Sequence, residues 1–99
     1  MAKKHTAIEL FIIKAVKKRR LELNINPSKL SKEIGLNRSF VGKIEKLELG
    51  NRYSVNQLNE IAKVLHCNVA DFFPLPYMEE DCVEEFQTIH PPRARIYDV

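Results

Sequence analysis

Residues 27–45 read PSKLSKEIGLNRSFVGKIE, and this stretch decides the fold. On either side of its central Gly-Leu-Asn, four apolar residues fall at helical spacings: Leu30, Ile34, Val41 and Ile44. Two short helices with this pattern would share one buried face across a sharp turn. The stretch therefore has the spacing of a helix-turn-helix.

Local signals mark the ends of both helices. Asn26 before Pro27 is typical of an N-cap followed by proline at the first helical position. Gly35 is expected to end the first helix, because glycine adopts the required turn conformation without steric cost. We expect Leu36 to plug the turn and Asn37 to cap the second helix.

The second helix has an inward and an outward face. Val41 and Ile44 face the core, which leaves Arg38, Ser39 and Lys43 free to face outward. These three side chains are the candidates to reach base edges in the major groove of DNA. Arg38 is the strongest of them, because its guanidinium can bond both acceptors of a guanine.

Three further helices follow from the spacing of apolar residues. The first spans about residues 6–23, and another spans about residues 54–66 behind a serine cap. A short last helix over residues 69–73 would end where prolines begin. We expect an all-α, five-helix domain over residues 6–73 and a C-terminal extension over residues 74–99.

From about Ile12 to Phe73 the chain resembles the phage-repressor-like helix-turn-helix family, also called the Cro-like or xenobiotic-response-element family. In that family a glycine closes the first motif helix, an apolar residue follows, and a polar residue caps the recognition helix. Here these residues are Gly35, Leu36 and Asn37. The resemblance implies a lambda-repressor-like bundle that binds double-stranded DNA, as a homodimer on inverted half-sites.

The resemblance also implies a buried ion pair. Family members pair an arginine of the first helix with a glutamate that ends the recognition helix, and these positions hold Arg20 and Glu45. Arg20 falls within the apolar face of its helix, where a guanidinium requires a carboxylate partner. We expect a largely buried pair whose role is to hold the recognition helix against the first helix.

Two positions depart from the family pattern. Pro27 stands where the family has a glutamine that helps grip the DNA backbone, and Ser31 stands where it has an alanine. Ser28, or the amides at the start of the helix, are the candidate substitutes for the missing glutamine.

The predicted contacts to the DNA backbone come from several elements: Lys17, Arg19, Ser28, Asn37 and Phe40. For Lys17 and Arg19 the alternative is a solvated charged face of the first helix. For Phe40 the alternative to contact with a thymine methyl or a sugar is the rim of the core. Gly42 lowers helix propensity, which suggests a close approach of its backbone either to DNA or to another helix.

Charge is unevenly distributed along the chain. Residues 1–66 hold fourteen Lys and Arg against six Asp and Glu, a net charge of +8. Residues 67–99 hold two against seven, a net charge of −5. A basic body is the electrostatic footprint of a phosphate-binding surface, whereas an acidic tail indicates a separate role or a solvated terminus.

The extension contains two weak patterns. Residues 79–87 are predicted to form a short acidic helix with one apolar side, and residues 93–99 alternate weakly like a strand. Three interpretations are open: a mobile tail, a dimer-forming extension, or a docking segment for a protein partner.

Cysteine and histidine positions lack the spacing of a metal site. Cys67 and Cys82 are expected to be reduced thiols. His66 adjoins Cys67, but His5 and His90 lie near opposite ends of the sequence, so no paired ligands are present. We expect no metal and no cofactor.

No apolar run approaches the roughly 20 residues that a bilayer span needs, and no signal-peptide pattern follows the first lysines. We therefore expect a cytoplasmic protein without a membrane partner. The sequence shows no Ser/His/Asp, Cys/His or paired-carboxylate arrangement, so we do not expect an enzyme.

Three hypotheses of function follow. The leading one is a sequence-specific transcriptional regulator that represses. The alternative is the antitoxin of a toxin-antitoxin pair, which would regulate its own promoter and bind a toxin through its C-terminal tail. The third is a protein-interaction module that has lost DNA binding, for which Pro27 is the one hint and against which the basic excess speaks.

Overall fold

The computed structural model describes residues 3–92, and every regular element in that range is helical. The bundle contains α1 (Ala7–Glu22), α2 (Pro27–Glu33), α3 (Phe40–Glu45), η1 (Leu47–Leu49), α4 (Val55–Val64) and η2 (Val69–Phe72), where η marks a 3-10 helix. A further helix, α5 (Cys82–Ile89), follows in the extension. The predicted all-α class with a helix-turn-helix is confirmed.

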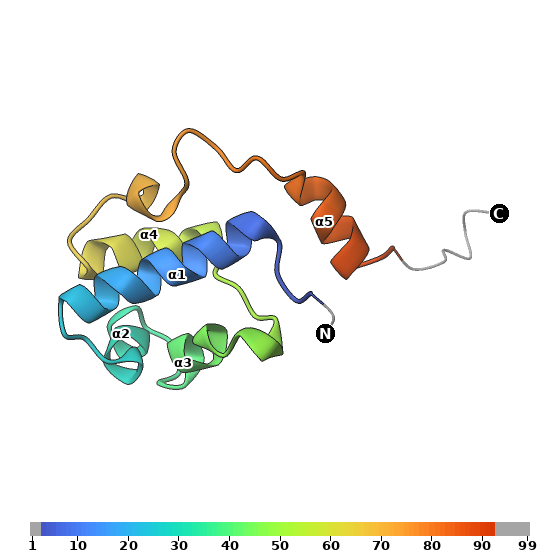
Figure 1. Ribbon diagram of the computed structural model, residues 1–99. Helices are drawn as coiled ribbons and strands as arrows, with labels where there is room; N and C mark the ends of the chain where they lie inside the picture. The colour runs from blue at the N-terminus through green and yellow to red at the C-terminus, as the bar shows by residue number, and fades with distance from the viewer. Residues whose placement is uncertain (1–2, 93–99) are drawn as a thin grey trace.

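Figure 1 shows α2 and α3 together on one side of α1, with α5 beyond the N-terminal end of α1. None of the helices in the described part of the chain combines the length and the apolarity that a bilayer span requires.

A single core joins the bundle. Its buried apolar side chains come from every α-helix of the bundle and from η2, and they include Ile13, Val16, Leu30, Val41, Ile44, Leu58, Ile61 and Phe72. Burial of one such side chain contributes about 1.5–3 kcal/mol relative to leaving it exposed. The inward face predicted for the motif therefore holds α2 and α3 to each other and to α1.

Reciprocal caps fix the two long helices of the bundle. Thr6 accepts a hydrogen bond from the Glu9 backbone N–H, and Glu9 accepts one from the Thr6 N–H. Ser54 and Gln57 form the same capping box at the start of α4. Each box satisfies two backbone donors that the first helical turn leaves unpaired. Both helices lie within about two residues of their predicted ends.

The turn between α2 and α3 differs from the prediction in two ways. Gly35 has φ +79° and ends α2 as expected. Leu36, however, is 36% exposed, and Ile34 packs against the core instead. Asn37 does not cap α3: its Oδ1 accepts from the Ser39 backbone N–H at 2.9 Å and hydroxyl at 2.7 Å, closing a separate turn before α3 begins at Phe40.

The fifth helix of the predicted bundle is also different. Residues 69–72 form the 3-10 helix η2 rather than an α-helix. Asn68 and Asp71 cap each other at its start, and Phe73 is already in an extended conformation. A run of four residues before Pro74 leaves no room for a second α-helical turn.

The extension contacts the bundle through α5, which lies close to the helix predicted over residues 79–87. Glu85 accepts a hydrogen bond from the Ala7 backbone N–H at 2.9 Å and pairs with Lys3. The Arg52 guanidinium lies 5.0 Å from the centre of the Phe86 ring. These contacts join α5 to the N-terminal end of α1 and to the segment that precedes α4. The weak strand pattern over residues 93–99 lies outside the described residues.

Candidate nucleic-acid interface

Arg20 and Glu45 meet in a two-pronged ion pair between α1 and α3. Arg20 Nη2 donates to Glu45 Oε1 at 2.7 Å, and Nε donates to Oε2 at 3.0 Å. The third arm of the guanidinium, Nη1, donates to the Ile25 carbonyl at 2.8 Å. The side chains are only 5% and 10% exposed. Such a parallel pair fixes orientation as well as distance, so it sets the angle of α3 on α1.

Ser31 forms a second link, this time between α2 and α3. Its hydroxyl donates to the Pro27 carbonyl at 2.8 Å and accepts from the Val41 backbone N–H at 2.9 Å. Ser39, the residue before α3, makes no side-chain cap of its own. Ser31 therefore caps α3 from the neighbouring helix, which gives this departure from the family pattern a structural role.

We expect Ser31→Ala to lower the free energy of unfolding by about 1–3 kcal/mol, because the buried Val41 N–H would lose its acceptor. Urea denaturation followed by circular dichroism measures the change. Ser28→Ala is the matched control on an exposed position of the same helix, and it should stay within about 0.5 kcal/mol of the wild type. Equal effects of the two substitutions would contradict the proposed cap.

The three predicted base-reading residues lie close together in the chain at one end of the motif, and all are exposed. Arg38 and Ser39 belong to the turn before α3, and Lys43 belongs to the helix itself. Val41 and Ile44 are buried, as the inward face requires. Because the Ser39 hydroxyl donates to Asn37, its oxygen remains available to accept a hydrogen bond from a base.

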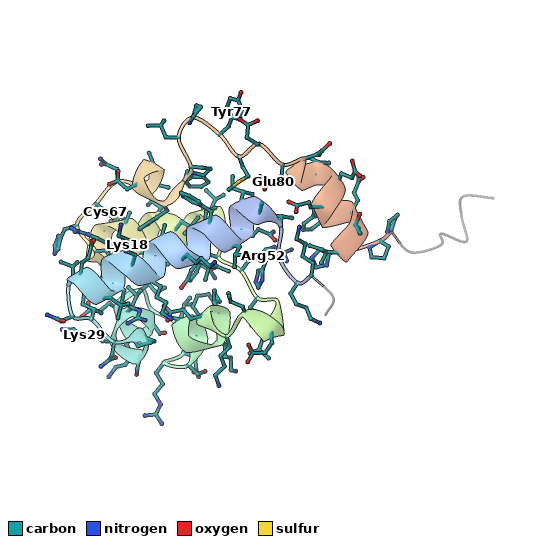
Figure 2. The ribbon with its side chains drawn as sticks, viewed as in Figure 1. Lys18, Lys29, Arg52, Cys67, Tyr77 and Glu80 are labelled. Carbon is teal, nitrogen blue, oxygen red and sulfur yellow. The ribbon has the colours of Figure 1, made fainter. Side chains whose placement is uncertain are left out.

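The start of α2 offers polar groups beside this turn. Asn26 accepts from the Lys29 N–H at 2.8 Å, and Pro27 has no N–H to offer. Of the first three residues of α2, Ser28 is therefore the one with a backbone N–H and a hydroxyl for a phosphate. Lys29 and Lys32 line the same exposed groove, and Figure 2 shows Lys29 at the outer surface of α2.

Lys29 and Lys32 are absent from the predicted backbone contacts. The signal was readable in the sequence: two lysines three residues apart share a face of a helix, and Leu30 points the other way.

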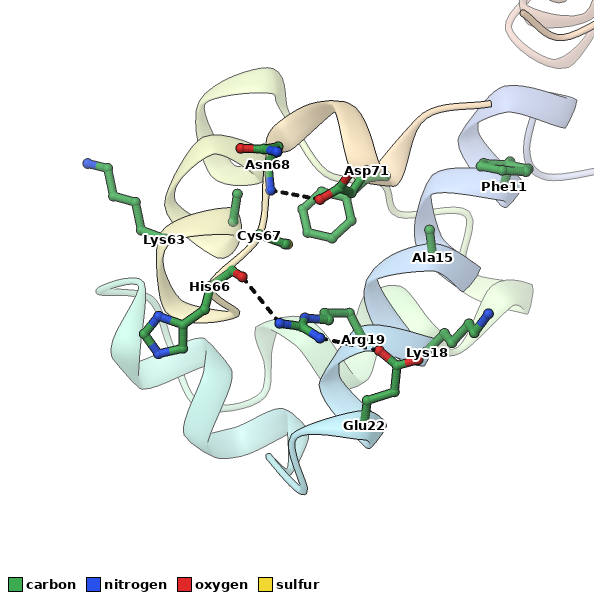
Figure 3. A pocket seen from close by; sticks show the side chains of 12 residues that line it. Phe11, Ala15, Lys18, Arg19, Glu22, Lys63, His66, Cys67, Asn68 and Asp71 are labelled. Atoms are coloured by element: carbon green, nitrogen blue, oxygen red, sulfur yellow. Dashed lines mark hydrogen bonds and ion pairs between the residues drawn. The ribbon is translucent and has the colours of Figure 1, made fainter. Parts of the chain in front are cut away.

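Arg19 has structural partners on the far side of the bundle. Its Nε donates to the Leu65 carbonyl at 2.9 Å, Nη2 donates to the His66 carbonyl at 3.2 Å, and Nη1 lies 3.5 Å from Glu22. These bonds satisfy carbonyls at the end of α4. A phosphate would have to compete with these partners (Figure 3), which argues against the contact predicted for Arg19, and that contact stays a prediction. Lys17 is exposed on α1, and its predicted contact stays a prediction.

Phe40 lies at the rim of the core, where its ring centre is 6.0 Å from that of Tyr53. This packing is the alternative that the sequence left open. The Phe40 side chain is partly exposed, so its predicted contact with a DNA sugar stays a prediction.

Gly42 has no packing reason to be glycine in the described part of the chain. A Cβ built there meets no atom within 4 Å, so no neighbouring helix crowds it.

We expect Gly42→Ala to raise the free energy of unfolding by up to about 1 kcal/mol through helix propensity. If DNA approaches this backbone, the same variant binds its operator more weakly. Thermal unfolding measures the change in stability, and fluorescence anisotropy measures the change in DNA binding. A variant that is less stable than the wild type and binds DNA equally well would contradict both expectations.

Tyr53 has a buried hydroxyl without a hydrogen-bond partner among residues 3–92. Burial, and then the nearby Glu45 carboxylate, raise the pKa of this phenol well above its ordinary value of 10. In the unfolded chain the phenol loses its proton near pH 10, whereas in the folded chain it keeps it. Stability from this group is therefore complete below pH 10 and is lost as the pH rises further, by about 1.4 kcal/mol per pH unit.

We expect Tyr53→Phe to be at least as stable as the wild type at pH 7, because no hydrogen bond is lost. Its stability should also fall less steeply above pH 10, because the variant has no phenol at this position to lose a proton on unfolding. Urea denaturation at pH 7 and pH 10.5 tests both points. A destabilised variant would mean that the hydroxyl has a partner, such as a bound water.

Comparison with known proteins agrees with a helix-turn-helix fold. The family model described as a Cro/C1-type HTH DNA-binding domain matches residues 16–76. No curated protein matches the chain in sequence. The hydroxypropylphosphonic acid epoxidase from S. wedmorenis superposes with a TM-score of 0.62 at 22% identity, over 77% of this chain and 39% of that one. This likeness shows a shared fold alone, and the present chain spans about two fifths of that protein's length.

Proposed function

Because the chain belongs to the Cro/C1-type helix-turn-helix DNA-binding family, we propose that this DNA-binding regulator recognises a specific operator and represses transcription. One observation carries the proposal. The Arg20–Glu45 pair and the Ser31 cap hold α3 by its inner side, so that the exposed residues at its start are positioned on a rigid support. Preorganised side chains of this kind are what base recognition requires.

Binding would have two parts. Ser28, Lys29 and Lys32 at α2 would contact phosphates and fix the register of the protein on the duplex. Arg38 would bond the O6 and N7 of a guanine in the major groove, Ser39 would accept from a base amine, and Lys43 would contact a base or a phosphate. The family resemblance supports a homodimer on inverted half-sites. We propose that the chain acts in the cytoplasm as a binding protein and not as an enzyme.

The direct test is selection from a genomic DNA library with the purified full chain at two salt concentrations. We expect an inverted-repeat motif to be enriched at both, with weaker binding at high salt. Binding that falls steeply with salt and enriches no motif would mean phosphate contact alone, and the regulator proposal would fail. Transcription from a promoter that carries the selected motif then gives the sign of regulation.

An antitoxin role is the second candidate, and the extension supports it. Leu75 and Tyr77 are exposed on the segment between η2 and α5, where a toxin could cover them. Figure 2 shows Tyr77 pointing away from the bundle. A toxin-like reading frame beside the gene, whose product co-purifies with this chain, would favour this role. If no such reading frame is found, the repressor role remains as the one candidate function.

A further inference from the structure

The Ser39 hydroxyl, in the turn before α3, has its proton already committed to Asn37. Asn37 Oδ1 lies 2.9 Å from the Ser39 backbone N and 2.7 Å from the Ser39 Oγ. A backbone N–H can only donate, so the Asn37 atom that it meets is the amide oxygen and not the amide nitrogen. The hydroxyl meets the same oxygen, which can only accept, so its single proton points at Asn37. The two contacts together fix the amide of Asn37 and the hydroxyl of Ser39.

What the Ser39 hydroxyl can still offer a ligand is an acceptor. A serine oxygen has two lone pairs beside its one proton, and here the proton is used within the turn. Both Ser39 and Asn37 are exposed, so DNA in contact with the start of α3 can reach this oxygen. The amide nitrogen of Asn37 takes no part in the turn and remains the group that could donate to a phosphate.

The four bases differ in what they present to such an acceptor in the major groove. Adenine presents its N6 amine and cytosine its N4 amine, whereas guanine and thymine present carbonyl oxygens. Against an amine, Ser39 keeps its bond to Asn37 and gains a second one. Against a carbonyl, the hydroxyl either faces it with a lone pair or turns its proton away from Asn37, which exchanges one bond for another. One net hydrogen bond therefore separates the two classes of base.

We propose that Asn37 determines specificity through Ser39. By holding the hydroxyl proton, Asn37 makes Ser39 select adenine or cytosine over guanine and thymine at the base that Ser39 contacts. Asn37 is thus a positioning residue, which acts on the base through its neighbour. This inference rests on the proposed function, because it requires the start of α3 to enter the major groove.

Four operators that differ only in the base pair facing Ser39 test this selectivity with the full chain. Ser39→Ala identifies the position, because in the genomic selection this variant loses its preference there. For the wild type we expect adenine or cytosine to be bound roughly threefold to tenfold more tightly per half-site than guanine and thymine, as one net hydrogen bond implies. Fluorescence anisotropy gives the four dissociation constants.

Two substitutions of Asn37 distinguish control of the hydroxyl from a merely structural role. Asn37→Ala releases the Ser39 proton, so the hydroxyl can donate or accept, and the four constants should agree to within about twofold. Asn37→Asp is the matched control, because its carboxylate accepts from the same two donors. It should bind all four operators more weakly, since it adds a negative charge beside DNA, and it should keep the wild-type preference. Circular dichroism verifies that every variant is folded.

Three results would overturn the inference: a wild type that prefers guanine or thymine at this position, an Asn37→Ala variant that keeps the wild-type preference, or a Ser39→Ala variant that enriches an unchanged motif. In each case the enriched motif would still support the proposed function. A wild type that enriches no motif at all would count against the proposed function itself, and this inference would fall with it.

Discussion

Replacing Arg20 by methionine is expected to lower the free energy of unfolding by about 3–5 kcal/mol. The Glu45 carboxylate is only 10% exposed and would lose both of its guanidinium bonds, so a buried charge would be left without a partner. The Ile25 carbonyl would lose its donor as well. Because a small domain is stable by about 5–15 kcal/mol, this loss would be a large fraction of the total stability. Urea denaturation at 25 °C measures the change.

The double variant Arg20→Met, Glu45→Leu distinguishes the cost of an unpaired buried charge from the contribution of the ion pair itself. Removing both charges leaves none buried, so it should recover much of the stability that the single variant loses. A single variant within about 1 kcal/mol of the wild type would show that the pair does not hold α3 on α1.

Arg38→Ala should weaken binding to the selected operator by about 1–3 kcal/mol per half-site, which is roughly fivefold to 150-fold, while leaving stability unchanged. Binding to unrelated DNA should change much less, because the lost contact is to a base. Lys29→Ala is the informative comparison. If it removes a phosphate contact, it should weaken binding to every sequence alike and reduce the salt dependence by about one unit of slope.

Anisotropy titrations at several salt concentrations give both quantities. Lys14→Ala, an exposed cation of α1 outside the proposed interface, should have little effect. If Arg38→Ala weakens all DNA equally, Arg38 contacts phosphate and not a base.

The helices of the bundle were predictable because their signals are local. Leu30 and Ile34 are spaced as on one helix face, and so are Val41 and Ile44. Gly35 follows α2 at a positive φ, which glycine adopts without steric cost. The pairing of Arg20 with Glu45 needed the family resemblance, since it joins residues 25 positions apart.

Other features depend on partners that spacing does not reveal. Ser31 looks like a neutral replacement until the Val41 N–H is found to lie against its hydroxyl. The sequence favoured Asn37 as the cap of α3, but the same side chain can close a turn onto Ser39, and that competing hydrogen bond decides the outcome. Arg19 looked like a free cation that could bind phosphate, because the carbonyl that it contacts at the end of α4 lies 46 residues away in the sequence.

The measurement that tests the central claim most directly is the genomic DNA selection run with the wild type and with Arg38→Ala side by side. If the start of α3 reads base edges, both proteins should enrich the same inverted repeat, except that the variant loses its preference at one position in each half-site. Identical motifs from the two proteins, or no motif from the wild type, would contradict the assignment of α3 as the recognition helix.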